Sequence, residues 1–217
     1  MTELAGLILP SFLQTLFMVA VSTLLAAILG FPLGILLYML APQGLLQNPR
    51  LRVLLERIVN ALRSFPFIIL MIILFPVTRF IVGTSIGTSA AVVPLAIAAA
   101  PFVARVVESA LEGVDRGIVE AALTSGAGKM RIVFSVLVPE AAPALVSGLT
   151  LTIINLVGYS AMAGAIGGGG LGDLAIRYGY QRFRIDIMAA AVIVIILLVE
   201  GVQFAGTRIA RDMLRRR

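Results

Sequence analysis

The amino-acid sequence predicts an all-α, polytopic membrane protein with about five transmembrane helices. Of the 217 residues, 60% are hydrophobic and only 13% are charged, whereas soluble domains carry roughly 25% charged residues. The apolar residues gather in long runs, the first of which extends from Phe12 to Leu40 without a charged side chain. Since a transmembrane helix needs about 20 mainly apolar residues, lipid is expected to surround much of this chain.

The first run is expected to be a permanent span. Glu3 and no basic residue precede it, whereas a cleavable signal peptide has a basic start and an apolar core of about 7–15 residues. Four more spans follow, at about 58–82, at 81–104, within 141–172 and between 186 and 208. A tight turn around Gly83 to Gly87 is expected to join the second span to the third.

The distribution of basic residues predicts an orientation with the N-terminus outside and the C-terminus in the cytoplasm. Segments 41–63, 105–142 and 208–217 would then lie inside and hold 13 of the 17 Lys and Arg residues. Only Arg79, Arg177, Arg182 and Arg184 would lie outside. Cytoplasmic loops are enriched in Lys and Arg, so this orientation is the better one. We expect one transmembrane domain over 12–210 and a basic cytoplasmic tail over 211–217.

The longest polar segment between spans, about 105–140, is predicted to form two short cytoplasmic helices. Asp115 can cap the first helix, and Gly126 can stop it. In the second helix, apolar residues recur at helical spacing from Ile132 to Leu137, and Pro139 is expected to end it.

A motif within this segment resembles the EAA loop of the permease subunits of bacterial ABC importers. Glu120, Ala121 and Ala122 are followed after three residues by Gly126, and Pro139 closes a Val-Leu-Val-Pro run at 136–139. The family pattern has Ile and Leu where Val136 and Val138 stand, which is a mild departure. The resemblance implies that these five motif residues belong to a coupling loop over about 112–140, whose coupling helices dock into a groove on the ATP-binding subunit.

The likeness extends over essentially the whole chain, to the permeases of bacterial methionine importers. It rests on segments 63–67, 82–87, 100–105, 158–164, 169–172 and 177–180. One departure is Gly128-Lys129, where many relatives place a small hydroxyl residue that can cap the second coupling helix.

The resemblance implies a multi-pass protein of the bacterial inner membrane that imports methionine, both L- and D-, as part of an assembly. That assembly would contain two copies of this chain, two ATP-binding subunits and an extracytoplasmic methionine-binding protein. ATP and Mg²⁺ would be used by the partner ATPase, and this chain would bind no cofactor and catalyse no covalent reaction. A permease for another small amino acid or related solute remains an alternative.

The fourth span carries the candidate residues of the translocation pathway: Asn155, Tyr159, Ser160 and Met162. Polar groups that face lipid are costly, so Asn155 and Ser160 should face protein or a water-filled path. Such groups can also hold helices together, and both interpretations stay open from the sequence.

The residue types exclude several other functions. The chain has no Cys and no His, which removes thiolate and imidazole metal sites and the usual nucleophilic dyads of an intramembrane hydrolase. Gly126 to Lys129 lacks the first Gly and the final Ser or Thr of a phosphate-binding loop. Basic residues lie between apolar runs rather than along one stripe, so no nucleic-acid partner is expected. We found no internal repeat of the kind common in secondary transporters, which makes ATP-independent transport the weaker alternative.

Three further features remain open from the sequence. Gly30 and Gly34 have the spacing of close helix contacts, although Pro32 between them is also compatible with a simple kink. Glu200 is an acid deep within the last span and has no assigned partner. Arg105 and Glu108 can form a local pair at spacing i,i+3.

Overall fold

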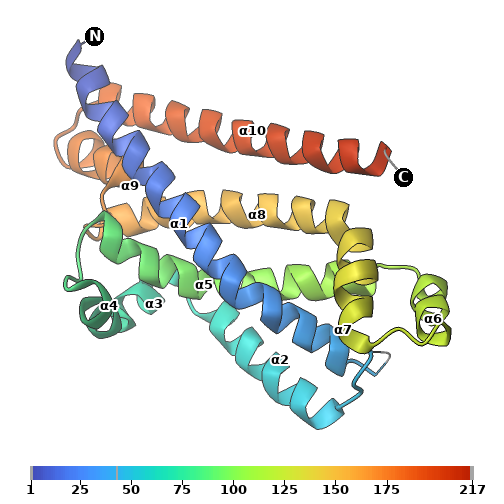
Figure 1. Cartoon of the computed structure of the whole chain (residues 1–217). Helices are drawn as coiled ribbons and strands as arrows, with labels where there is room; N and C mark the ends of the chain where they lie inside the picture. The colour runs from blue at the N-terminus through green and yellow to red at the C-terminus, as the bar shows by residue number, and fades with distance from the viewer. Residues whose placement is uncertain (1, 43, 216–217) are drawn as a thin grey trace.

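The computed structural model describes residues 2–42 and 44–215, and this part of the chain is helical with no β-strand. The elements in chain order are α1 (Thr2–Leu40), α2 (Pro49–Ser64), α3 (Phe67–Ile73), α4 (Phe75–Val82), α5 (Thr88–Glu112), α6 (Arg116–Thr124), α7 (Lys129–Ile132), the π-helical turn η1 (Val133–Leu137), α8 (Val138–Ala165), α9 (Gly170–Leu174), the π-helical turn η2 (Ala175–Tyr180) and α10 (Ile185–Arg215). Figure 1 shows α1, α5, α8 and α10 as the long helices of a bundle, with α6 at one end and α9 at the other.

The described residues contain four helices that are long and apolar enough to cross a membrane. They cover Gly6–Leu40, Thr88–Glu112, Lys129–Ala165 and Ile185–Arg215. The first, third, fourth and fifth predicted spans therefore correspond to long helices. The last helix includes most of the predicted basic tail and continues to Arg215; Arg216 and Arg217 of that tail lie outside the described residues.

The predicted second span is not one continuous helix. Its residues are divided among α2, α3 and α4, and the chain is extended at Phe65, whose ψ is 129°. Pro66 follows, and steric clash with a proline ring disfavours the helical conformation of the residue before it. A second break occurs at Leu74, directly before α4 with its own early Pro76. The expectation of an unbroken helix over 58–82 was therefore wrong.

Helix α5 lies at the centre of the bundle and is packed most closely against α1. Fifteen of its residues are buried, as expected of a helix with neighbours on several sides. A β-carbon added to Gly30 or Gly34 of α1 would lie within 2.7 Å of the β-carbon of Val103 or Val107. Close packing therefore explains the two glycines, and α1 continues as a helix through Pro32.

At the α9 end of the bundle, hydrogen bonds join turns that are distant in sequence. Gly83 and Gly87 have φ values of 85° and 109°, so the predicted tight turn is present. The Gly87 amide donates to the carbonyl of Gly167 at 2.9 Å. The side chains of Gln14 and Thr15 on α1 accept hydrogen bonds from the amides of Gly170 and Leu171. These bonds satisfy backbone groups in an otherwise apolar region, where an unpaired group would be costly.

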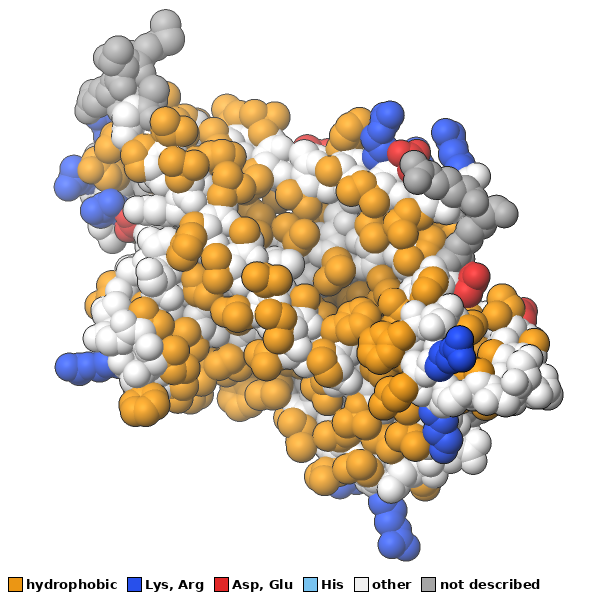
Figure 2. Space-filling model, in the orientation of Figure 1, with side chains coloured by type: hydrophobic (Ala, Val, Ile, Leu, Met, Phe, Trp, Pro, Cys, Tyr) orange, Lys and Arg blue, Asp and Glu red, His pale blue; other side chains and the backbone are white. Residues whose placement is uncertain are grey.

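On the face shown in Figure 2, apolar side chains cover much of the surface, and the charged side chains lie mainly toward its edges. Helix α10 contributes many of these exposed apolar residues, among them Ile193, Leu197 and Phe204. Exposed apolar area on this scale is unusual for a water-soluble monomer and fits a protein solvated by lipid. Glu200 is also exposed on α10.

Candidate functional site

The predicted coupling segment forms helix α6, whose two ends are defined by the expected residues. The Asp115 carboxylate caps the helix by accepting a hydrogen bond from the Gly117 amide at 2.7 Å. The chain then turns at Gly126, whose φ is 76°, a value that glycine adopts at little cost. Of the motif residues, Glu120 and Ala121 are exposed and Ala122 is half-buried.

The prediction that Pro139 ends a second short helix is wrong. Helix α7 passes through the π-helical turn η1 directly into α8, and Pro139 lies in the first turn of that long helix. The amide of Val138 donates to the carbonyl of Val133, five residues earlier, and this wider turn leads the backbone past a residue without an N–H. Figure 1 shows a sharp bend where α7 meets α8. Pro139 therefore lies at a bend between α7 and α8 and does not end a helix. As predicted from Gly128, no side chain caps the start of α7.

The coupling segment is only loosely packed on its own chain. Helix α6 has no buried residue, although Val119 and Ala122 contact the main core. Ile118, Leu123 and Met130 expose 42%, 45% and 59% of their surface. A surface of this kind, apolar and attached to the bundle along one side, is suited to contact with another protein.

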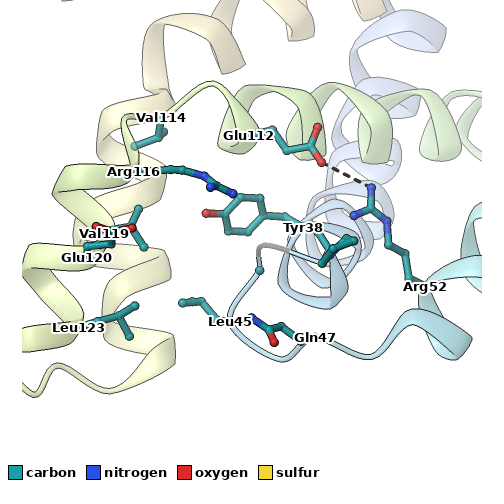
Figure 3. Close-up of a pocket in the computed structure, with 13 residues that line it drawn as sticks. Tyr38, Leu45, Gln47, Arg52, Glu112, Val114, Arg116, Val119, Glu120 and Leu123 are labelled. Carbon is teal, nitrogen blue, oxygen red and sulfur yellow. Dashed lines mark ion pairs between the residues drawn. The ribbon is translucent and has the colours of Figure 1, made fainter.

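A cleft of about 730 Å³ lies between α6 and the adjacent ends of α1, α2 and α5. Arg52 and Glu112 line it on one side, and Arg116 and Glu120 line it on the α6 side. Figure 3 shows the Arg116 side chain extending into the cleft toward Tyr38. The cleft therefore places charges of both signs beside the predicted coupling residue Glu120.

A cluster of ion pairs connects α2 to α5 at the edge of this cleft. The carboxylate of Glu108, which is only 2% exposed, pairs with Arg105 at 2.6 Å and with Arg52 at 3.2 Å. Arg52 also pairs with Glu56 at 2.8 Å and with Glu112 at 3.5 Å. The hydrogen bond to Glu56 is the main reason that the pKa of Arg52 is raised, and Glu108 and Glu112 act in the same direction. The predicted local pair of Arg105 and Glu108 is therefore part of a larger network.

A second cavity, of about 220 Å³, lies where the break between α2 and α3 faces α5 and α8. Tyr159 of α8 lines it and stacks on Phe67 of α3, with the ring centroids 4.9 Å apart and the planes 7° apart. Asn155, one turn from Tyr159 on α8, also lines the cavity and is exposed. Arg63 and Phe65 line it from the end of α2.

The four pathway candidates are not all brought together. Asn155 and Tyr159 share the small cavity, whereas Ser160 is 2% exposed and its hydroxyl donates to the carbonyl of Val157 at 2.7 Å. Met162 is 44% exposed and lies outside the cavity lining. Arg63 and Phe67 also line this cavity, although no pattern in the sequence assigned them to it. The Phe65-Pro66 pair between them was the available signal of a helix break.

Neither cavity has the residues of a metal site. Within residues 2–42 and 44–215, no group of three or more Asp or Glu side chains is placed to hold a metal ion. The arrangement presents an exposed helix beside a charged cleft, and a small cavity with aromatic walls between helices.

Comparisons with known proteins agree with this description. The model of the family "binding-protein-dependent transport system inner membrane component" matches residues 30–215. The probable D-methionine transport system permease protein of Vibrio cholerae is 50% identical over 95% of this chain and 92% of its own length. The methionine import system permease protein of Bacillus subtilis is 45% identical over 83% of this chain and 82% of its own length. A solved structure of a methionine ABC transporter in an inward-facing conformation has a TM-score of 0.96 at 45% identity, and covers 98% of this chain and 99% of its own.

Proposed function

The chain belongs to the family of binding-protein-dependent transport system inner membrane components, and we propose that it is the permease subunit of an ATP-driven importer that conducts methionine. The observation that carries the proposal is the similarity to methionine permeases over nearly the full length of both chains. The exposed helix α6, which bears the EAA motif, is consistent with it.

In the proposed assembly, two copies of this chain span the bacterial inner membrane and bind two ATP-binding subunits. A two-fold homodimer is the simplest arrangement, because one chain offers one coupling segment and each ATPase subunit needs one. A methionine-binding protein delivers the substrate from outside. ATP and Mg²⁺ act on the ATPase subunits, and this chain provides the path without covalent chemistry.

Coupling is proposed to act through α6 and the bend that follows it. Glu120, Ala121 and Ala122 would lie in a groove of the ATPase subunit, where small side chains let two backbones approach closely. When the ATPase subunits close on ATP, α6 would move as a rigid body. Gly126, in the turn before α7, and Pro139, at the bend into α8, would set the angles between these helices. The movement of α6 would thereby be passed to α8 and to the membrane-spanning bundle.

The pathway is proposed to pass the small cavity beside Asn155 and Tyr159. Met162 lies seven residues from Asn155 and three from Tyr159, so the three side chains share one face of α8. Met162 would extend the same path. Ser160 is assigned to helix structure in this proposal, since its hydroxyl is buried and bonded to Val157.

The experiment is uptake of labelled L-methionine by proteoliposomes that contain this chain, its ATPase partner and the binding protein. We expect uptake that requires ATP and both partners, and a loss of uptake in the Glu120→Arg variant. Asp212→Arg, which makes the same charge change at an exposed position of α10, is the matched control and should retain uptake. Uptake that proceeds without ATP or without the ATPase subunit would contradict the proposal.

A further inference from the structure

We propose that Arg63 anchors the carboxylate of the transported amino acid in the small cavity between α2, α3, α5 and α8. The inference rests on the proposed import of methionine and assigns a recognition role to a residue outside the EAA motif.

Arg63 is a cation with no ion-pair partner among residues 2–42 and 44–215. Among the described residues no carboxylate pairs with it, and its guanidinium lies 5.9 Å from the centre of the Phe102 ring. Arg52 and Arg105, by contrast, each pair with at least two carboxylates. The Arg63 side chain is exposed, so its guanidinium is accessible to an anionic group of a ligand.

Two neutral polar groups converge on the same cavity and are also free to bind a ligand. The Asn155 amide and the Tyr159 hydroxyl have no hydrogen-bond partner within the part of the chain that the structure describes. Both can donate and accept hydrogen bonds. An ammonium group could therefore be met by their oxygens while Arg63 holds the carboxylate of the same molecule.

The rest of the cavity is small and, apart from Thr152, whose hydroxyl donates to the Gly148 carbonyl, it is apolar. Phe67, Leu70 and Leu156 are buried around it, and the Phe67 ring is held flat against Tyr159. A thioether or aliphatic side chain would find favourable contacts there, since sulfur packs well against aromatic rings. The volume of about 220 Å³ is below the roughly 300–1,000 Å³ of sites for drug-sized ligands, which favours a solute of amino-acid size.

The lining also indicates what the cavity should reject. It contains no Asp or Glu, so a cationic side chain would meet Arg63 without a neutralising carboxylate. The geometry thus points to a zwitterionic amino acid with an apolar side chain, and to the carboxylate as the group that determines binding.

The test is photolabelling of the permease–ATPase complex in lipid nanodiscs with a diazirine analogue of methionine. The binding protein is left out, so that its own recognition of methionine cannot contribute. Labelled peptides are identified by mass spectrometry. We expect labelling of α3 or α8 beside the cavity, and we expect L-methionine to compete for it. Methioninol, in which an alcohol replaces the carboxylate, should compete at least about tenfold more weakly.

Three variants make the assignment specific. Arg63→Gln should lower labelling about tenfold at a sub-saturating probe concentration, and L-methionine and methioninol should then compete equally. Arg63→Lys should retain part of the preference for the carboxylate. Arg57→Gln removes an exposed arginine of the same helix that lies outside the cavity, and it should label as the unmodified chain does. Co-purification with the ATPase subunit shows that each variant is assembled.

Labelling outside the cavity, or equal labelling of Arg63→Gln and the unmodified chain, would overturn the role of Arg63. If proteoliposomes that contain the same complex and the binding protein still took up methionine in an ATP-dependent manner, that failure would leave the proposed function intact. Absence of such uptake by the unmodified complex would instead overturn the proposed function.

Discussion

Two arginines on helix α2 illustrate how one residue type serves different purposes at the two ends of the same helix. Arg52 and Arg63 are eleven residues apart, about three helical turns, so they project from the same face. Arg52 contacts the carboxylates of Glu56, Glu108 and Glu112, whereas Arg63 has no carboxylate within the described part of the chain. An arginine that is paired with carboxylates holds helices together, whereas an arginine without such a partner can bind an anionic ligand.

The difference follows from what each end must do. At the cleft, α2 and α5 must keep a fixed position relative to each other, because α5 leads directly into the coupling segment. In the small cavity the solute must enter and leave, so a permanent internal partner for Arg63 would compete with it. On this account, substitutions at the cleft should mainly reduce stability, and those at the cavity should mainly reduce transport.

The largest effect is expected for Glu108→Ala, which removes the buried carboxylate shared by Arg52 and Arg105. Breaking a buried ion pair from one side costs about 3–5 kcal/mol, so the thermal unfolding temperature of the purified permease should fall markedly. Circular dichroism at increasing temperature measures it. Glu120→Ala, at an exposed position of α6, is the control and should unfold like the unmodified protein. An unchanged unfolding temperature for Glu108→Ala would show that the cluster does not hold α2 and α5 together.

A smaller effect is expected for Asp115→Ala, which removes the N-terminal cap of α6. Loss of such a cap destabilises a helix by about 1 kcal/mol. A less rigid α6 should transmit movement less well, so more ATP should be hydrolysed per methionine imported. Thr124→Ala alters a hydroxyl at the other end of α6 that bonds only to the carbonyl of Ala121 and should leave this ratio unchanged. An equal ratio in both variants would argue against rigid coupling through α6.

A further decrease in stability is expected for Tyr159→Leu, which removes the ring stacked on Phe67. Aromatic pairs contribute about 0.5–1.5 kcal/mol beyond their buried area, so the unfolding temperature should decrease slightly. Uptake should fall more strongly, because the cavity loses both a wall and a hydroxyl. Tyr159→Phe keeps the ring and should restore the stability but not all of the uptake. Full uptake by Tyr159→Leu would remove this cavity from the pathway.

Features carried by local sequence could be predicted. Asp115 and Gly126 delimit α6 because a cap and a left-handed turn depend on neighbouring residues alone. The pair of Arg105 and Glu108 was also predictable, since side chains three residues apart meet on any helix. Four of the expected helices were predictable as well, because each corresponds to a long apolar run of local sequence.

Features that depend on packing between distant segments could not be predicted. Arg52 meets Glu108 across 56 positions of sequence, and a single sequence does not specify how two helices are aligned. The break at Phe65-Pro66 was hidden because hydropathy averaged over a span is insensitive to one proline. Pro139 was misjudged for the opposite reason, since a π-helical turn let the helix continue past a residue that usually ends one.

The most direct test of this account compares Arg52→Gln with Arg63→Gln in the same preparation, by thermal unfolding and by the initial rate of ATP-dependent methionine uptake. Arg52→Gln should lower the unfolding temperature because Glu112 loses its ion-pair partner and Glu56 and Glu108 each keep only Arg105. Arg63→Gln should change stability by no more than about 0.5 kcal/mol and yet greatly reduce uptake. If instead Arg63→Gln destabilised the protein as much as Arg52→Gln, or transported methionine at the unmodified rate, the division between a structural and a ligand-binding arginine would be contradicted.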